Sequence, residues 1–307
     1  MIRRNVTTWR ELGFCLWCMS CAPHNSTAAA SPTADFPTPW EGGVGSAPPT
    51  GTVAVNPEPS TAPVAEAPSL DEPTSSAVAA MDDRHALVIG NSKYLTTPLP
   101  NPANDARLMA KELQSVGFNV RLVIDGTRDQ MIKAINDFQF ELSHHSQGVG
   151  LFYYAGHGIQ VDGSNYLVPV NAHLMRAEDT EVEAVNLNLV LARMDSSNSR
   201  FKFVILDACR NNPFPGVGRT IGRGLAFVSA PTGTLIAYAT APGDVAADGE
   251  SGHSPFTSAL ARELHRPGEE IGNTLKSVRA AVQTATRGKQ TPWESTSIVG
   301  DFYFVEK

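Results

Sequence analysis

The chain has 307 residues, 42% of them hydrophobic and 18% charged, and its formal net charge is −7. This length allows one or two globular domains. The negative charge, with no stripe of basic residues, argues against nucleic acid as a partner, because nothing is present to neutralise phosphates.

The first 21 residues resemble a targeting segment. Three arginines precede the short apolar run 12–19, a pattern typical of a signal peptide, and the run is too short to cross a bilayer. Cys21 stands where a lipoprotein signal carries its lipid-bearing cysteine. Three residues earlier, however, Cys18 replaces the aliphatic residue that is usual in such signals. A lipid anchor at Cys21 is one interpretation, and an unprocessed, disordered N-terminus is the other.

Residues 22–80 are dominated by Pro, Ala, Ser, Thr and Gly. Such a composition cannot bury enough apolar surface to offset the entropy of ordering, so we expect a flexible, partly extended tether. A tether directly behind a signal-like segment favours export or membrane anchoring over a cytoplasmic location.

The remaining region, 82–305, alternates short apolar runs with amphipathic stretches, as helices and strands do in one folded domain. Strands are predicted at 84–91, 119–125, 148–158, 202–208, 234–240 and 297–304. Helices are predicted from 101–105 to 116, at 127–145 and 185–194, from Ser254, and at 271–286. Two short runs around Asp162-Gly163 predict a hairpin within 159–170. This order predicts an α/β sandwich with a mainly parallel sheet of about six strands, flanked by helices.

Two of these strands end in residues suited to thiol chemistry. The buried run 203–206 leads to Cys209, and the run 149–154 leads to His157, which lies between two glycines. Ligands and catalytic groups gather at the carboxyl ends of parallel strands. If the two strands are neighbours, a thiol and an imidazole open into one crevice. Cys209 is the one cysteine of the folded region, so it has no partner there for a disulfide, although a lone cysteine is more often buried and inert.

The segments Tyr154-Ala-Gly-His-Gly158 and Asp207-Ala-Cys-Arg-Asn211 resemble the histidine and cysteine boxes of caspase-like cysteine peptidases, peptidase family C14. The pattern is most similar to the bacterial metacaspase-like group, or orthocaspases. Cys209 follows His157 by 52 residues, close to the roughly 50 residues of caspases. The resemblance covers about 82–305 and implies a caspase-like α/β sandwich. Asp207 stands where animal caspases have glutamine.

The resemblance implies a role for each matching residue. Cys209 corresponds to the nucleophile and His157 to the general acid/base, and the backbone N–H groups of Gly158 and Cys209 correspond to the oxyanion hole. Asp105 and Asp207 correspond to the acids that select Arg or Lys before the cut, since a buried carboxylate needs a cationic partner. For Asp105 alone, an acid that complements the dipole of the first helix is the other interpretation.

The chain departs from the eukaryotic metacaspases at two places. Ala155 replaces a serine common there, and the dense acidic loop of the calcium-dependent members is absent, since 178–181 is more simply a solvated charge run. We therefore expect no required metal or cofactor. His144, His145, His173 and His253 show no zinc-ligand spacing.

Together these features predict a monomeric cysteine endopeptidase that cuts protein or peptide substrates after Arg or Lys. The glycine-rich segment 216–224 carries Arg219 and Arg223 and is a candidate site of self-processing. Two alternatives remain at this point: a non-catalytic caspase-fold scaffold that uses the crevice for binding, and a thiol hydrolase with a non-peptide substrate.

Overall fold

The computed structural model describes residues 83–145, 147–209, 224–244, 246–249 and 252–307, and of Cys209 the backbone alone. Several predicted features lie outside the described residues: the targeting segment with Cys21, the 22–80 tether, Arg219 and Arg223. In the part of the chain that is described, no helix is both long and apolar enough to cross a bilayer.

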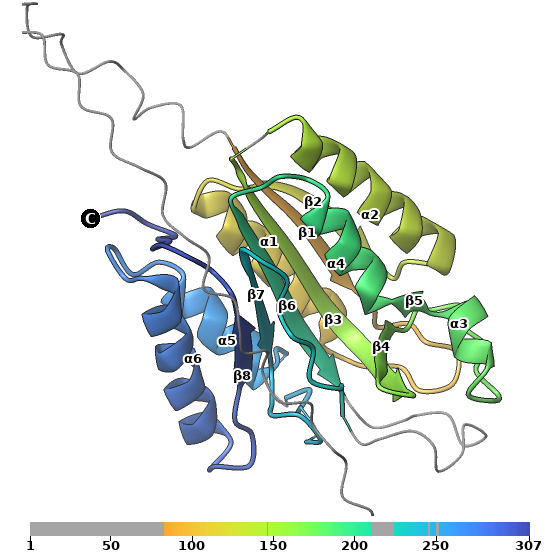
Figure 1. The fold of residues 1–307 in the computed structure, drawn as a ribbon. Helices are drawn as coiled ribbons and strands as arrows, with labels where there is room; N and C mark the ends of the chain where they lie inside the picture. Colours follow the sequence, from red (N-terminus) through yellow and green to blue (C-terminus); the bar gives the residue numbers. More distant parts are fainter. Residues whose placement is uncertain (1–82, 146, 210–223, 245, 250–251) are drawn as a thin grey trace, which may run out of the picture. The chain divides into compact units, whose positions relative to one another are not determined.

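A mainly parallel sheet forms the centre of the described domain (Figure 1). Its strand order is β2-β1-β3-β6-β7-β8, and β8 alone runs antiparallel to its neighbour. The bounds are β1 Arg84–Gly90, β2 Asn119–Ile124, β3 Val149–Val161, β6 Phe201–Cys209, β7 Thr234–Tyr238 and β8 Trp293–Thr296. Two short strands, β4 Ser164–Leu167 and β5 Val185–Asn186, extend from β3. The predicted α/β fold with six main strands is confirmed.

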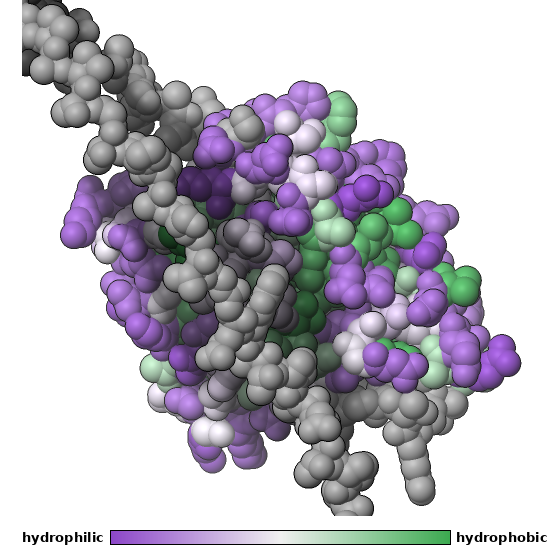
Figure 2. Space-filling model, viewed as in Figure 1, coloured by the Kyte–Doolittle hydropathy of each residue, from purple (hydrophilic) through white to green (hydrophobic). Residues whose placement is uncertain are grey.

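Helices cover both faces of the sheet, which explains why its inner strands β1, β3 and β7 are nearly continuous buried runs. The helices are α1 Pro102–Ser115, α2 Arg128–Ser143, α3 Asp179–Glu183, α4 Leu187–Asp195, α5 Pro255–Glu263 and α6 Ile271–Ala285. Helices α1, α5 and α6 pack on the face that receives Leu151 and Tyr153 of β3. Helices α2 and α4 pack on the face that receives Phe152 and Tyr154. In Figure 2, hydrophilic residues cover much of the visible surface, and hydrophobic residues gather near its centre, over the strands.

Local signals fix where the helices begin. Thr127 and Gln130 form a capping box at the start of α2, which satisfies two backbone N–H groups that lack helical partners. Ser254 caps α5 by accepting a hydrogen bond from the N–H of Thr257, at 2.9 Å. Pro102 and Pro255 follow the N-caps of α1 and α5, where proline's missing N–H costs nothing.

Two local predictions differ from the structure. The last strand is β8, at Trp293–Thr296, and 297–304 forms only an isolated bridge; its alternating Phe302 and Phe304 pack into the helix-covered core. The helix expected at 185–194 begins only at Leu187, after β5. The charge run 178–181 overlaps α3, with Glu178 and Glu181 exposed, as a solvated run requires, and Thr180 buried.

The third strand also runs further than predicted. It was expected to end at 158, but β3 continues to Val161 and pairs with β4 in the predicted hairpin around Asp162-Gly163. Both turn residues have positive φ, as the tight two-residue hairpin turn requires. The parallel pairing of β3 with β6, however, ends at His157. The histidine thus lies where β3 leaves the main sheet.

The chain reverses its direction of winding between β1 and β3. From β1 it moves outward to β2, and from β3 it moves the other way through β6 to β7. In such sheets the crevice for ligands lies beyond the carboxyl ends of the strands, near this reversal. His157, Cys209 and the loop that follows β1 all lie at this edge.

Candidate active site

His157 and Cys209 are opposite each other on adjacent strands. They are the last register pair of the parallel strands β3 and β6. The two strands are therefore neighbours, as a thiol and an imidazole must be to meet. The sequence could only suppose this. Gly158 follows in a close fit, because a Cβ there would lie 3.1 Å from that of Ala208.

The imidazole of His157 is held by the loop after β1. Its Nε2 lies 2.7 Å from the carbonyl oxygen of Thr97 and 3.2 Å from the Thr97 hydroxyl. A carbonyl oxygen only accepts, so these partners assign the proton of the neutral ring to Nε2. Nδ1 then carries a lone pair, and among the described residues it is buried without a hydrogen-bond partner. It is the ring nitrogen available to take a proton.

Burial keeps this imidazole neutral. The His157 residue is 4% exposed, and desolvation lowers its pKa below the ordinary value, an effect that the hydrogen bond to Thr97 only partly opposes. A neutral ring with a free Nδ1 is the form of histidine that acts as a general base.

Tyr94 holds the backbone and the ring of His157. Its phenol oxygen accepts from the N–H of His157 at 2.8 Å and donates to the carbonyl of Val168 at 3.2 Å. The two rings pack with centroids 4.3 Å apart. The phenol lies so close that a Cβ on Gly156 would come within 2.5 Å of it, and Gly156 has a φ of 151°. The glycine before the histidine thus makes room for Tyr94.

The loop that carries Tyr94 and Thr97 is itself tied to the sheet edge. Asp125, at the end of β2, accepts from the N–H groups of Ser92 and Lys93 at 2.8 and 3.0 Å. Asn91 donates to the carbonyl of Val168 and accepts from the N–H of Gly126. The histidine is therefore positioned by three neighbouring strand ends.

The two predicted pocket acids meet at the start of α5. Asp105, in the first turn of α1, accepts from the N–H of Ser254 at 3.1 Å. Asp207, at the end of β6, accepts from the hydroxyls of Ser254 and Thr257. The Asp105 carboxylate thus contacts the start of α5 as well as its own helix. An acid that only complements the dipole of α1 would not need this contact. Both residues are buried.

No basic side chain among the described residues forms an ion pair with Asp207, and Asp105 has only the imidazole of His253. Desolvation is the main cause that raises the pKa of both carboxyls, and the negative charge of Asp207 raises that of Asp105 further. A buried acid pair of this kind holds a proton above the ordinary carboxylate range.

A third acid, Asp248, was missed in the sequence. It lies in the segment after β7, which Asn101 holds by donating to the carbonyls of Asp248 and Gly249 at 2.6 and 2.8 Å. Its charge raises the pKa of both Asp105 and Asp207, and burial raises its own. One of its carboxylate oxygens, Oδ2, is buried without a partner among the described residues. The available signal was its place after a parallel strand, at the same edge as Asp207.

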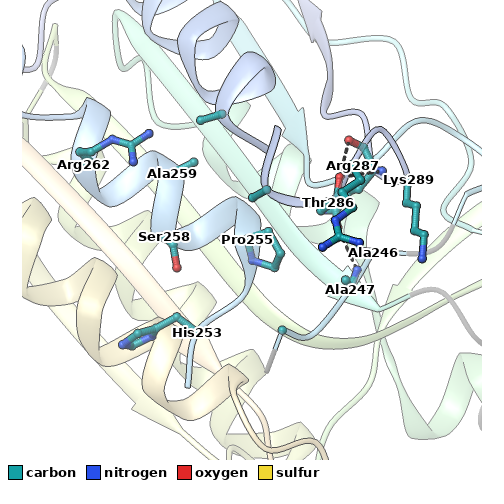
Figure 3. Close-up of a pocket in the computed structure, with 14 residues that line it drawn as sticks. Ala246, Ala247, His253, Pro255, Ser258, Ala259, Arg262, Thr286, Arg287 and Lys289 are labelled. Atoms are coloured by element: carbon teal, nitrogen blue, oxygen red, sulfur yellow. Dashed lines mark hydrogen bonds between the residues drawn. The ribbon is translucent and has the colours of Figure 1, made fainter. Parts of the chain in front are cut away.

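A separate cavity of about 760 Å³ lies between α5, α6 and the segments near 246–253 and 286–290 (Figure 3). Arg262, Arg287 and Lys289 line it, together with small side chains. Its lining includes neither His157 nor the pocket acids, so this cavity is not the crevice at the strand ends.

Comparison with known families identifies the domain. The family model described as the caspase domain, Peptidase C14, matches residues 83–303. The chain belongs to the caspase-domain family. This match spans all of the strands and helices given above, and it makes the domain a member of a family of cysteine peptidases that act on proteins.

Two curated relatives of the caspase domain are mouse mucosa-associated lymphoid tissue lymphoma translocation protein 1 homolog and its human counterpart. Each is 33% identical to this chain over 131 residues, 42% of the chain. The match covers 15% of the length of either relative. The similarity is thus limited to less than half of this chain and to a small part of either relative.

Tyr94→Phe tests whether the phenol positions the histidine. Phenylalanine keeps the ring contact but leaves the buried N–H of His157 unpaired, at a cost of about 1–3 kcal/mol in the free energy of unfolding. We expect kcat on a peptide substrate to fall about tenfold while KM stays constant, because only the placement of the imidazole changes. Steady-state kinetics and urea unfolding measure both effects. Tyr303→Phe, a matched change far from His157, should leave kcat unaltered, and equal losses in the two variants would contradict the positioning role.

Proposed function

We propose that this chain is an active cysteine endopeptidase of the metacaspase-like group, which cleaves after Arg or Lys with Cys209 as nucleophile and His157 as general acid/base. The observation that carries the proposal is the register pair His157 and Cys209, with a neutral imidazole whose Nδ1 is unoccupied. A scaffold without catalysis would have no need of an oriented, deprotonated Nδ1.

The chemical steps follow from these groups. Nδ1 of His157 takes the thiol proton, and the thiolate attacks the peptide carbonyl to form a tetrahedral intermediate. The backbone N–H groups of Gly158 and Cys209 stabilise its oxyanion. The imidazolium then gives its proton to the leaving amine, which leaves a thioester. Water, deprotonated by His157, hydrolyses the thioester and restores the thiol.

The acid pocket supports the preference for Arg and Lys. A guanidinium or ammonium between Asp105, Asp207 and Asp248 would supply the positive charge that these buried carboxylates lack. Since the pKa values of all three are raised in the empty pocket, cation binding should release protons. We therefore expect the apparent affinity for an Arg substrate to rise with pH above the ordinary carboxylate range, as the acids lose their protons.

A peptide-library digest compared with Cys209→Ala tests this function directly. Cleavage after Arg and Lys that requires the thiol supports the endopeptidase. Labelling by an arginine-based thiol-directed trap separates it from a hydrolase of non-peptide esters or amides. A protein that binds peptides with Cys209 intact but cuts none of them would be a scaffold. Activity unchanged by a chelator is expected, because the mechanism above requires no metal.

Self-processing is the next expected property. Arg219 and Arg223 match the specificity proposed for the pocket, and the glycine-rich sequence around them is typical of sites of nicking. We expect autocleavage after one of them, with the fragments held together by the sheet, since β6 and β7 pair directly. Intact-mass analysis of the wild type and Cys209→Ala measures it. Cuts in both proteins would point to a contaminating protease, and a wild-type chain that stays whole while cutting an Arg substrate would contradict processing.

The proposal also includes three properties of the whole chain: export with a lipid anchor at Cys21, a tether over 22–80, and a monomeric state. Fractionation of cells that express the full chain, compared with Cys21→Ser, tests the anchor. A chain that stays in the soluble cytoplasmic fraction would contradict it.

A further inference from the structure

His253 contacts the proposed cation pocket from the segment before α5. Its Nδ1 lies 3.0 Å from Oδ1 of Asp105. The His253 side chain is 36% exposed, whereas that of Asp105 is 2% exposed. An imidazole reachable from solvent therefore covers a carboxylate that is otherwise buried.

The direction of the side chain agrees with this contact. In Figure 3, the ring of His253 points away from the rest of the cavity lining and toward α1, the helix that carries Asp105. His253 lies outside α5, immediately before the cap Ser254. Rotation of this side chain would break no helical hydrogen bond.

We propose that His253 occupies Asp105 in the substrate-free enzyme and must leave it before the cation of a substrate binds, so that His253 limits the affinity for Arg and Lys. The inference rests on the proposed function, because it assigns Asp105 to the substrate pocket. It adds a residue that competes with the substrate.

The contacts of Asp105 show why the imidazole is the partner that leaves. The N–H of Ser254 lies within hydrogen-bond distance of both carboxylate oxygens, at 3.1 and 3.3 Å, and belongs to the start of α5. Moving that N–H would disturb the cap that Ser254 forms with Thr257. The imidazole is held at Asp105 through Nδ1, on a half-exposed side chain. A bidentate guanidinium needs the acceptor positions that His253 now uses.

Asp207 offers less room for this exchange. Its Oδ2 accepts from two hydroxyls of α5, those of Ser254 and Thr257, inside the protein. These hydroxyls also connect to the core, because Thr257 bonds to the buried Tyr153. Substrate binding should therefore change the surroundings of Asp105 more than those of Asp207, and His253 is the group that moves.

Competition of this kind raises KM without altering the chemical step. When only a fraction of the enzyme has a free pocket, the apparent dissociation constant is the intrinsic one divided by that fraction. If the imidazole occupies Asp105 about 70–90% of the time, its removal lowers KM roughly 3- to 10-fold. The value of kcat should stay within about twofold, because His253 touches none of the reacting atoms.

The experiment compares the wild type, His253→Ala and the matched control His173→Ala on Arg and Lys peptide substrates. We expect KM to fall only in His253→Ala. An unchanged or higher KM in that variant, with the control at wild-type values, would overturn the inference and would mean that His253 supports Asp105 instead. Melting temperatures report whether each variant is folded.

A binding measurement in the full chain keeps the inference separate from catalysis. Cys209→Ala and Cys209→Ala/His253→Ala are titrated with agmatine, a small guanidinium probe, by calorimetry, and the double variant should bind more tightly. In Cys209→Ala, the imidazole NMR signals of His253 should shift as agmatine is added, which tests displacement without changing His253. Equal affinities and unshifted signals would overturn the inference alone. Absence of agmatine binding in both proteins, with no cleavage after Arg or Lys by the wild type, would instead overturn the proposed function.

Discussion

Cys209→Ala and His157→Ala should each lower kcat/KM on an Arg peptide at least about a thousandfold, which corresponds to roughly 4 kcal/mol of the activation barrier. The proposed nucleophile is absent in the first variant, and in the second the proposed general base for the thiol proton is absent. The structure places the two residues on adjacent strands in register, so each loss removes one half of the pair. Single-turnover kinetics with purified variants measures the effect.

The His157 variant should also be less stable than the wild type. His157 lies at a strand end, yet the residue is buried and packs against Tyr94. His157→Ala should therefore lower the free energy of unfolding by about 1–3 kcal/mol. His144→Ala, at an exposed position, serves as the control. Wild-type turnover in either active-site variant would contradict the assignment.

The pH profile of the wild type gives an independent check on His157. Its pKa is lowered by burial, so the neutral, basic form persists below the ordinary histidine value. The acid limb of kcat/KM that belongs to the free imidazole should consequently lie below pH 6.5, the ordinary value. Because the pocket acids add their own acid limb to kcat/KM on an Arg substrate, the imidazole of His157 is also followed by NMR in Cys209→Ala. A pKa above 6.5 for His157 in that titration would show that the imidazole is not desolvated.

Asp105→Asn should abolish most cleavage after Arg and Lys while making the folded domain more stable. Loss of a buried charged partner for the guanidinium should cost roughly 2–5 kcal/mol, or about 30- to several thousandfold in kcat/KM. Asparagine keeps the shape of the side chain and can still accept from the N–H of Ser254, so the start of α5 is preserved.

The gain in stability follows from the raised pKa of Asp105. As pH rises, the carboxyl ionises first in the unfolded chain, near the ordinary value of 3.8, and only later in the folded protein. The wild type thus loses stability as pH rises through this interval, and the asparagine variant does not. At pH 8 we expect Asp105→Asn to be more stable by about 1–3 kcal/mol.

Urea unfolding at pH 5 and pH 8 measures this difference, and Asp129→Asn is the matched control, since Asp129 is an exposed acid in the first turn of α2. The control should gain no stability at pH 8. A wild-type protein as stable at pH 8 as the Asp105→Asn variant would show that the acid pair carries no repulsion. Full activity of the Asp105→Asn variant on Arg substrates would show that Asp105 does not bind the substrate cation.

Local sequence signals determined much of this fold. The apolar runs of β1, β3, β6 and β7 are buried on both faces, and proline, glycine and capping residues punctuate the helices between them. Because parallel strands present their carboxyl ends at one edge, the sequence also indicated that His157 and Cys209 share a crevice. That β3 and β6 are neighbours, so that the two residues pair, came only from the strand order of the structure.

Tertiary structure alone decided the surroundings of these residues. Thr97, Tyr94 and Asp248 reach the site from loops, where hydrophobic periodicity carries no signal, and their partners are distant in the sequence. His253 meets Asp105 across 148 residues for the same reason. The short strand β8 and helix α3 were also decided by packing, because a few residues with mixed polarity have no clear period. The sequence thus determined which groups stand at the strand ends, and only the folded chain decided which side chains hold them, cover them and set their charge.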